Sequence, residues 1–215
     1  MILTAIITII AAYLLGSINF AVIFTKAFKK GDIREYGSGN PGTTNVMRVG
    51  GFWPGALTFI FDALKGYAAC MLGKLMFAYI SGGMSSWWSA PYAGAYFCAV
   101  ACMIGHIFPL FFGFKGGKGV ATSVGIFAVC CPISIVIGLL VFAVITIISR
   151  YVSLGSLIAT VVVITLATVF RNEYTPVLVQ VFCCLIMATL IYYKHIGNIK
   201  RLCSGKENKI KLGGK

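Results

Sequence analysis

Charged side chains are scarce in this sequence, and acidic ones are the scarcest. Only 11% of the 215 residues are charged, with five Asp and Glu against 18 Lys and Arg, while 59% are hydrophobic and the mean hydropathy is +0.94. A soluble domain needs far more polar surface than this composition supplies. The apolar residues are also spread too evenly to leave a soluble domain beside a membrane anchor. We therefore expect residues 1–215 to form a single integral membrane domain.

Apolar runs cover most of the chain. Most of them reach the roughly 20 residues that a helix needs to cross the hydrocarbon core of a bilayer. The first run lacks a small-residue cleavage site after a short apolar core, so it predicts a retained helix and not a signal peptide. The runs occupy approximately 2–25, 52–80, 91–114, 119–149, 151–170 and 176–193.

The distribution of Lys and Arg decides between six and seven helices. Basic residues gather on the cytoplasmic side of membrane proteins. A single span at 119–149 would scatter them over both faces, whereas a split at Cys131-Pro132 leaves only Lys74 and Arg171 opposite the rest. We therefore predict an all-α protein with seven transmembrane helices, an outside N-terminus, a cytoplasmic C-terminus and a short, tilted or re-entrant segment at 119–131. The same bias explains the net charge of +13 without a nucleic-acid partner.

The eight cysteines do not indicate a disulfide framework. Seven lie in or beside apolar runs, where Cys commonly serves as a small packing residue, and Cys203 lies in the basic tail. Cys98 and Cys102 have the i, i+4 spacing of a helix face and in principle could bind a metal, but packing is the favoured interpretation. No metal and no cofactor is expected.

A polar, glycine-rich segment at 31–48 interrupts the apolar pattern. Its glycines can adopt positive φ, and backbone N–H groups in successive turns form a concavity that binds anions. Arg48 adds a planar fork that matches a phosphate group. The alternative is a basic loop with ordinary turn glycines, but the alternation of glycine with short polar side chains favours a phosphate site. The residues concerned are Gly37, Ser38, Gly39, Asn40, Gly42, Thr43, Thr44 and Asn45.

A second glycine-rich segment, 113–122, leads into a predicted helix. Gly116, Gly117 and Gly119 alternate with Lys115 and Lys118. Mobile backbone donors beside a helix N-terminus favour an oxyanion. The segment is not a Walker A loop, because Lys118 is followed by Gly119 and not by Ser or Thr, and so the sequence gives no support to an ATPase.

Two further polar stretches follow the remaining helices. Ser156 lies just after the turn at Arg150, although a hydroxyl in a membrane helix commonly bonds back to its own preceding turn. His195, Asn198 and Arg201 recur every three residues and would share one helix face, with Glu207 beyond them. A basic tail of this kind can also simply bind anionic lipid.

Ionisable residues also occur inside predicted helices. Asp62 and Lys65 lie three residues apart, so they are expected to face the bundle interior and pair with each other. A structural ion pair is at least as good an interpretation as catalysis. His106, on an apolar helix end, is more simply a packing residue than a proton shuttle.

The four polar stretches, in this order, resemble the bacterial acyl-phosphate-dependent glycerol-3-phosphate acyltransferases. The resemblance covers nearly the whole chain and rests on Gly-Ser-Gly-Asn-Pro-Gly-Thr-Thr-Asn at 37–45 with Arg48, on 114–122, on Arg-Tyr-Val-Ser-Leu-Gly-Ser at 150–156, and on the tail at 195–207. Small departures occur at Asn19 and Thr43, where the family usually has Pro and Ala.

The resemblance implies an enzyme of the bacterial inner membrane with its active site at the cytoplasmic face. It would move a fatty acyl group from acyl phosphate to the 1-hydroxyl of glycerol 3-phosphate, giving lysophosphatidic acid and phosphate, the first step of phospholipid biosynthesis. The matching functional positions are Ser38, Arg48, Lys118, Ser156, His195, Asn198 and Glu207. Phosphate binding would fall to Gly39, Asn40, Gly42, Thr43, Thr44, Asn45, Gly116, Gly117 and Lys118.

A motif typical of enzymes with thioester donors is missing from the sequence. Acyltransferases that use thioester donors typically carry an Asp five positions after a His, but here Phe111 follows His106 and Lys200 follows His195 at that distance. This absence favours acyl phosphate. The rival is a phosphate or organophosphate transporter with the same glycine loops, but the two halves of the chain show no convincing repeat. The enzyme is expected to act as a monomer in lipid.

Overall fold

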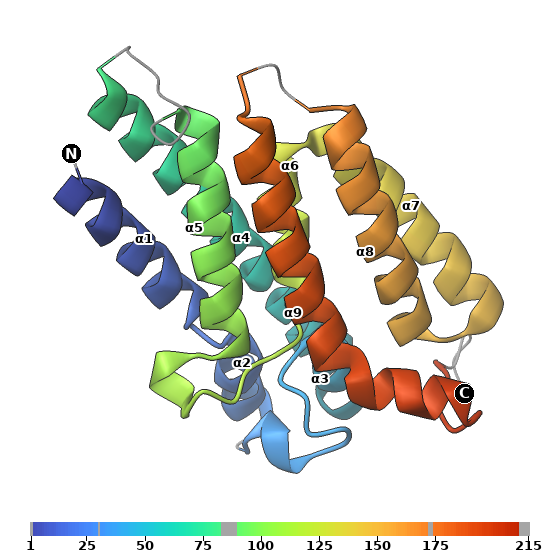
Figure 1. Cartoon of the computed structure of the whole chain (residues 1–215). Helices are drawn as coiled ribbons and strands as arrows, with labels where there is room; N and C mark the ends of the chain where they lie inside the picture. The colour runs from blue at the N-terminus through green and yellow to red at the C-terminus, as the bar shows by residue number, and fades with distance from the viewer. Residues whose placement is uncertain (1, 30, 83–89, 172–173, 211–215) are drawn as a thin grey trace.

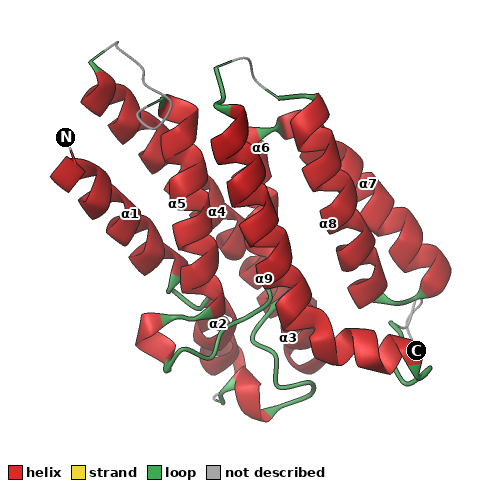
Figure 2. Cartoon of the chain, viewed as in Figure 1, coloured by secondary structure: helices red, strands yellow, loops and turns green. Residues whose placement is uncertain are grey.

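The computed structural model describes residues 2–29, 31–82, 90–171 and 174–210, and every regular element within these ranges is helical (Figures 1 and 2). The elements are α1 Ile2–Gly16, α2 Phe20–Lys29, the 3-10 turn η1 Ile33–Glu35, α3 Thr43–Gly50, α4 Phe52–Ser81, α5 Pro91–Ile107, the 3-10 turn η2 Leu110–Phe112, α6 Val120–Cys130, α7 Pro132–Ser149, α8 Val152–Val169 and α9 Val177–Cys203.

Six helical segments of the described chain are long and apolar enough to cross a membrane, and α6 is a shorter apolar helix. The all-helical membrane fold and the short helix near 119–131 are thereby confirmed. The division falls where the sequence predicts it, because α6 ends at Cys130 and Pro132 begins α7. Proline is well suited to the first turn of a helix, since its missing N–H is not needed there. Which face of the membrane each end occupies stays a prediction.

The first apolar run forms two helices and not one. Gly16 ends α1 where its Cα packs directly against the Cys102 carbonyl of α5, and a Cβ there would overlap that backbone. Asn19 then starts α2, because its Oδ1 accepts a hydrogen bond from Val22 N at 3.2 Å. The break leaves the Ile18 carbonyl outside the helical ladder, where a side chain of α4 reaches it.

The long helices run side by side, and the polar segments gather at one end of the bundle. α1, α4 and α5 form one group, α7 and α8 form a pair, and α9 passes between them (Figure 1). α2, α3, the loops around them and the last turns of α9 all lie at the same end (Figure 1). Small residues permit close packing inside the bundle, since Gly66 of α4 faces the Thr122 carbonyl and Gly125 of α6 faces the Ala63 carbonyl. The helix bundle thus brings the polar loops together at one end.

Candidate active site

A polar cleft of about 1020 Å³ opens at this end of the bundle. Its walls come from the first glycine-rich segment at 32–41, from 111–116 in the second, and from Lys26 and Lys194 on α2 and α9. The two segments that the sequence predicts as anion sites therefore line the same cleft, although one follows α2 and the other follows α5 in the chain.

Arg34 holds these two segments together. Its Nε and Nη2 donate to the two carboxylate oxygens of Asp32 at 3.0 and 2.8 Å, and its Nη1 donates to the Phe112 carbonyl at 2.7 Å. The hydrogen bond from Arg34 lowers the pKa of Asp32, so the pair stays charged and balanced. Glu35 also lines the cleft, and the positive excess comes from three lysines: Lys26, Lys115 and Lys194.

The first glycine-rich segment ends in the N-terminus of α3. Gly42 is its N-cap and makes no side-chain cap, so the amide groups of Thr43 and Thr44 are among the donors that a helix leaves without an internal partner. The Thr43 hydroxyl is buried and has no hydrogen-bond partner in the described part of the chain. These groups are suited to receive an anion.

Asn45 plays a different part from its polar neighbours. Its Oδ1 accepts from Ser38 N at 2.9 Å, and its Nδ2 donates to the Tyr36 carbonyl at 2.9 Å. With only 2% of its surface exposed, the side chain is engaged in holding the turn at Gly37, where φ is +60°. It shapes the loop that carries Ser38, Gly39 and Asn40 into the cleft.

The second segment packs against the first at Gly117. A Cβ at this position would overlap His106 Nε2 and lie 2.7 Å from the Pro41 carbonyl oxygen. Gly116 is equally confined against the His106 carbonyl, and its N–H donates to the Ile107 carbonyl at 3.1 Å. Only glycine fits between these backbones, which explains the repeated glycines before Lys118.

Lys118 heads a chain of hydrogen bonds that crosses to α9 and the C-terminal tail. Its Nζ contacts Asn198 Oδ1, and Asn198 Nδ2 donates to Glu207 Oε1 at 2.6 Å. The same carboxylate accepts from Ser153 Oγ at 3.0 Å and from Arg201 Nε at 2.7 Å. Three of the predicted site residues, Lys118, Asn198 and Glu207, thus lie in direct succession, and Arg201 joins them through Glu207.

The charge states of Lys118 and Glu207, at the two ends of this chain of hydrogen bonds, follow from burial and hydrogen bonding. Burial lowers the pKa of Lys118 to about 8, with the charge of Glu207 opposing the shift. Burial would raise the pKa of Glu207, but hydrogen bonds from Asn198, Arg201 and Ser153 outweigh it and hold the pKa below its usual value. A buried lysine facing a fixed amide is ready to exchange that partner for an anion of higher charge.

His195 lies on the same helix, one turn before Asn198. Its Nδ1 lies 2.8 Å from the Ile191 carbonyl, which can only accept, so Nδ1 carries the proton. The other ring nitrogen, Nε2, is then the acceptor. The ring is buried, and it is not among the hydrogen-bond partners of Glu207.

Two predicted residues lie apart from this chain of hydrogen bonds. Arg48 is exposed on α3 and has no hydrogen bond or ion pair to any described residue. Ser156 lies on α8, where its hydroxyl donates to the Val152 carbonyl of its own helix at 2.9 Å. Ser156 lines an apolar pocket instead of the polar cleft.

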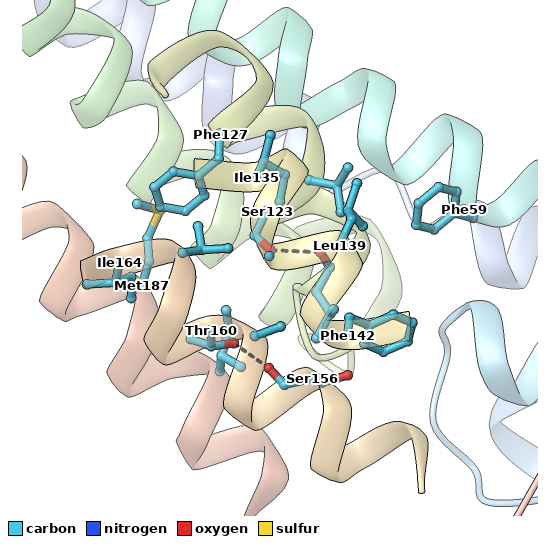
Figure 3. A pocket seen from close by; sticks show the side chains of 16 residues that line it. Phe59, Ser123, Phe127, Ile135, Leu139, Phe142, Ser156, Thr160, Ile164 and Met187 are labelled. Carbon is cyan, nitrogen blue, oxygen red and sulfur yellow. Dashed lines mark hydrogen bonds between the residues drawn. The ribbon is translucent and has the colours of Figure 1, made fainter. Parts of the chain in front are cut away.

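This apolar pocket, of about 80 Å³, lies between α4, α6, α7, α8 and α9. Figure 3 shows Phe59, Phe127 and Met187 around it, with Ser156 and Thr160 side by side on α8. The pocket adjoins the region of Lys118, because Val120 lines it two residues further on, while Gly116 lines the polar cleft two residues before. Likewise on α9, Ile191 lines the apolar pocket and Lys194 lines the polar cleft.

Several residues of the site carry no specific sequence signal. Lys26 and Lys194 appear as ordinary basic residues at helix ends, and only the folded cleft shows that they converge with Lys115 of the second glycine-rich segment. Ser153 precedes Ser156 in the same polar turn, but its bond to Glu207 joins segments 54 residues apart. A hydrogen bond of that range leaves no local pattern.

Comparison with known proteins identifies the family. The glycerol-3-phosphate acyltransferase family model matches residues 6–205. The chain belongs to the glycerol-3-phosphate acyltransferase family. The glycerol-3-phosphate acyltransferase of Thermoanaerobacter sp. (strain X514) is 41% identical over 207 residues, which is 96% of each chain. The resemblance seen in the four polar stretches is thereby confirmed.

Solved structures of this acyltransferase family have the same fold. The crystal structure of PlsY, an integral membrane glycerol 3-phosphate acyltransferase, in its glycerol 3-phosphate form matches with a TM-score of 0.81 at 39% identity, over 96% of each chain. The lysophosphatidic acid form matches with a TM-score of 0.79 at 39% identity, over 96% of this chain and 95% of that one. The chain is therefore an integral membrane acyltransferase.

Proposed function

We propose that the chain transfers a fatty acyl group from acyl phosphate to the 1-hydroxyl of glycerol 3-phosphate, with lysophosphatidic acid and inorganic phosphate as products. The observation that carries the proposal is the polar cleft adjoining an apolar pocket at Lys118. A reaction between a water-soluble phosphate ester and a lipid donor needs this pairing of environments.

The polar cleft is suited to the two phosphate groups. Lys26, Lys115 and Lys194 supply positive charge, and the N-terminus of α3, which follows Pro41 of the cleft wall in the sequence, supplies amide donors. Gly116 and Gly117 allow a close approach of the second loop. In the proposed complex Arg48 turns its free guanidinium to a phosphate group, and Ser38, Gly39 and Asn40 complete the wall. The apolar pocket receives part of the acyl chain beside Ser156.

The chemistry needs no covalent intermediate, because acyl phosphate is already an activated mixed anhydride. The glycerol hydroxyl oxygen attacks the acyl carbon, and the bond from that carbon to the phosphate oxygen breaks. Holding the two groups in near-attack geometry contributes several kcal/mol, on the order of 7 or more in favourable cases. Lys118 and the amides of the glycine loop stabilise the charge that develops on the carbonyl oxygen and the departing phosphate.

The hydroxyl proton has two possible acceptors. His195 offers an unprotonated Nε2 in a buried position. The departing phosphate is the other acceptor. Asn198 and Glu207 act by holding Lys118 and the end of α9 in place.

We further propose that the enzyme works in the bacterial inner membrane as a monomer, with the cleft on the cytoplasmic face. It uses neither a cofactor nor nucleic acid. The transporter alternative is not favoured, since the polar groups gather at one end of the bundle and the curated relatives are named as acyltransferases.

Release of inorganic phosphate tests the proposal. The purified protein in lipid receives palmitoyl phosphate and glycerol 3-phosphate, beside Lys118→Ala. We expect phosphate release that requires both substrates, yields lysophosphatidic acid and falls about 10²-fold or more in the variant. Folded protein that releases no phosphate, but moves glycerol 3-phosphate into sealed vesicles, would establish the transporter instead.

A further inference from the structure

A buried charged cluster lies directly behind the second glycine loop. Lys65 Nζ is 2.8 Å from Asp62 Oδ1, and the two side chains are 1% and 2% exposed. The pairing of these two residues within α4 is thereby confirmed. His106 Nδ1, on α5, lies 3.6 Å from the same Asp62 oxygen. Burying charged groups costs free energy unless each has partners, so a cluster of this kind is expected to serve the function of the protein.

The cluster contacts the break between α1 and α2 on one side and the second glycine loop on the other. Lys65 Nζ donates to the Ile18 carbonyl at 2.7 Å, where the break between α1 and α2 leaves that oxygen free. At the other side, His106 Nε2 lies against Gly117 so closely that a Cβ would overlap it. Gly117 in turn lies against Pro41 of the first glycine-rich segment.

The His106 ring is held in the cluster by packing. His106 Nδ1 is buried and makes no hydrogen bond of standard geometry within the described residues, and it lies 3.6 Å from the Asp62 oxygen that pairs with Lys65. The imidazole is therefore held by its position between the Asp62 carboxylate and the glycine loop. A change on either side of the ring would let the ring shift, and the loop would follow, because interiors are close-packed.

We infer that His106 and Asp62, with Lys65 as counter-charge, are positioning residues that set the place of the Gly116–Lys118 loop against the first glycine-rich segment. They touch neither substrate, and they act through the backbone that binds phosphate. The inference rests on the proposed function of that loop. It predicts that disturbing the cluster weakens the use of glycerol 3-phosphate even when the fold is intact.

Three variants separate positioning from folding. Asp62→Asn leaves Lys65 as an uncompensated buried charge and is expected to lower the Tm strongly. Asp62→Asn with Lys65→Gln removes both charges and is expected to recover most of the Tm. His106→Asn retains an amide donor toward Asp62 but removes the ring edge that meets Gly117. Gln180→Met is the matched control, since it removes a buried bond to the Ala167 carbonyl at the opposite end of the bundle.

The readouts are the Tm in lipid and the separate values of KM for glycerol 3-phosphate and kcat. We expect the double variant and His106→Asn to raise this KM about tenfold or more, because a displacement of about 1 Å in a phosphate site has effects of that size or larger. Gln180→Met should lower the Tm and leave the KM unchanged.

The inference is overturned if the double variant recovers the KM together with the Tm, or if His106→Asn keeps the KM within twofold of wild type. The cluster would then support only the fold. Absence of acyl transfer by the wild-type protein would instead refute the proposed function, and so the two failures are distinct.

Discussion

Lys118 is the side chain on which the two halves of the site converge. In the sequence it lies between Gly116, which lines the polar cleft, and Val120, which lines the apolar pocket, and its Nζ meets the Asn198 amide oxygen. Burial holds its pKa at about 8, so a part of its charge is lost within the range in which enzymes are commonly assayed. The Glu207 carboxylate behind Asn198 moderates this loss.

The charge of Lys118 predicts an alkaline limit to activity. The proposed role requires the protonated amine, so kcat/KM for the free enzyme should fall as pH rises through about 8. In Lys118→Arg the guanidinium stays charged, and the alkaline limb should move beyond the assay range. Profiles of kcat/KM between about pH 6 and 9.5 would check this. An unchanged limb in Lys118→Arg would contradict it.

Glycine at position 117 is required by the fit between two backbones. In Gly117→Ala the new methyl group meets His106 Nε2 and the Pro41 carbonyl, so the loop must move. We expect the KM for glycerol 3-phosphate to rise by about tenfold or more, with a smaller effect on Tm.

Gly197→Ala is the matched control for that substitution. A Cβ at Gly197 meets only the flexible end of Arg201 at 3.5 Å, and the position lies within α9. Replacing a helical glycine by alanine there should stabilise the protein by up to about 1 kcal/mol and leave the kinetics unchanged. Equal KM values in the two alanine variants would refute the steric argument.

The segment after α9 is fastened across the turn between α7 and α8. Ile210 N donates to the Arg150 carbonyl at 2.9 Å, and Lys209 Nζ lies 5.5 Å from the centre of the Tyr151 ring. Glu207 is the centre of this attachment through Ser153 and its partners on α9. The segment therefore fixes the last turns of α9, which carry Asn198.

Loss of the Glu207 charge should release this attachment. Its folded pKa lies below the usual 4.5, so its ionised form stabilises the fold above that pH, and the stabilisation is lost as pH falls through the folded pKa. The Tm of Glu207→Gln should therefore lie below that of wild type at neutral pH, and the difference should close as pH falls below 4.5. Thermal unfolding in lipid at several pH values measures this, and a pH-independent difference would exclude the charge as its cause.

The apolar runs, the division at Cys131-Pro132 and the four polar stretches could all be predicted from the sequence, since each depends on local composition. Other features depend on distant contacts. The break after Gly16 reflects the approach of α5, and the helical turns of α3 begin within what reads as a glycine-rich loop. Gly117 meets Pro41 and His106 only in the folded protein, and the distances between these residues along the sequence follow no pattern that predicts the contact.

Cys203 offers a direct test of the predicted orientation. It is exposed, whereas the other seven cysteines are buried. A membrane-impermeant maleimide should therefore label Cys203 in inverted vesicles and not in intact cells, and Cys203→Ser should abolish the labelling. Labelling of intact cells would place the C-terminus outside and reverse the topology.

The apolar pocket among α4 and α6 to α9 also predicts that the rate depends on the concentration of acyl donor in the lipid, and not on its concentration in the whole suspension. Its walls belong to apolar, membrane-type helices, so an acyl donor dissolved in the bilayer arrives by lateral diffusion in two dimensions. At saturating glycerol 3-phosphate the rate should follow the mole fraction of acyl phosphate in the lipid. Adding inert lipid at fixed volume should therefore slow turnover, whereas diluting the suspension with buffer should not. For one of the two substrates, the membrane and not the surrounding solution is the phase from which the enzyme draws.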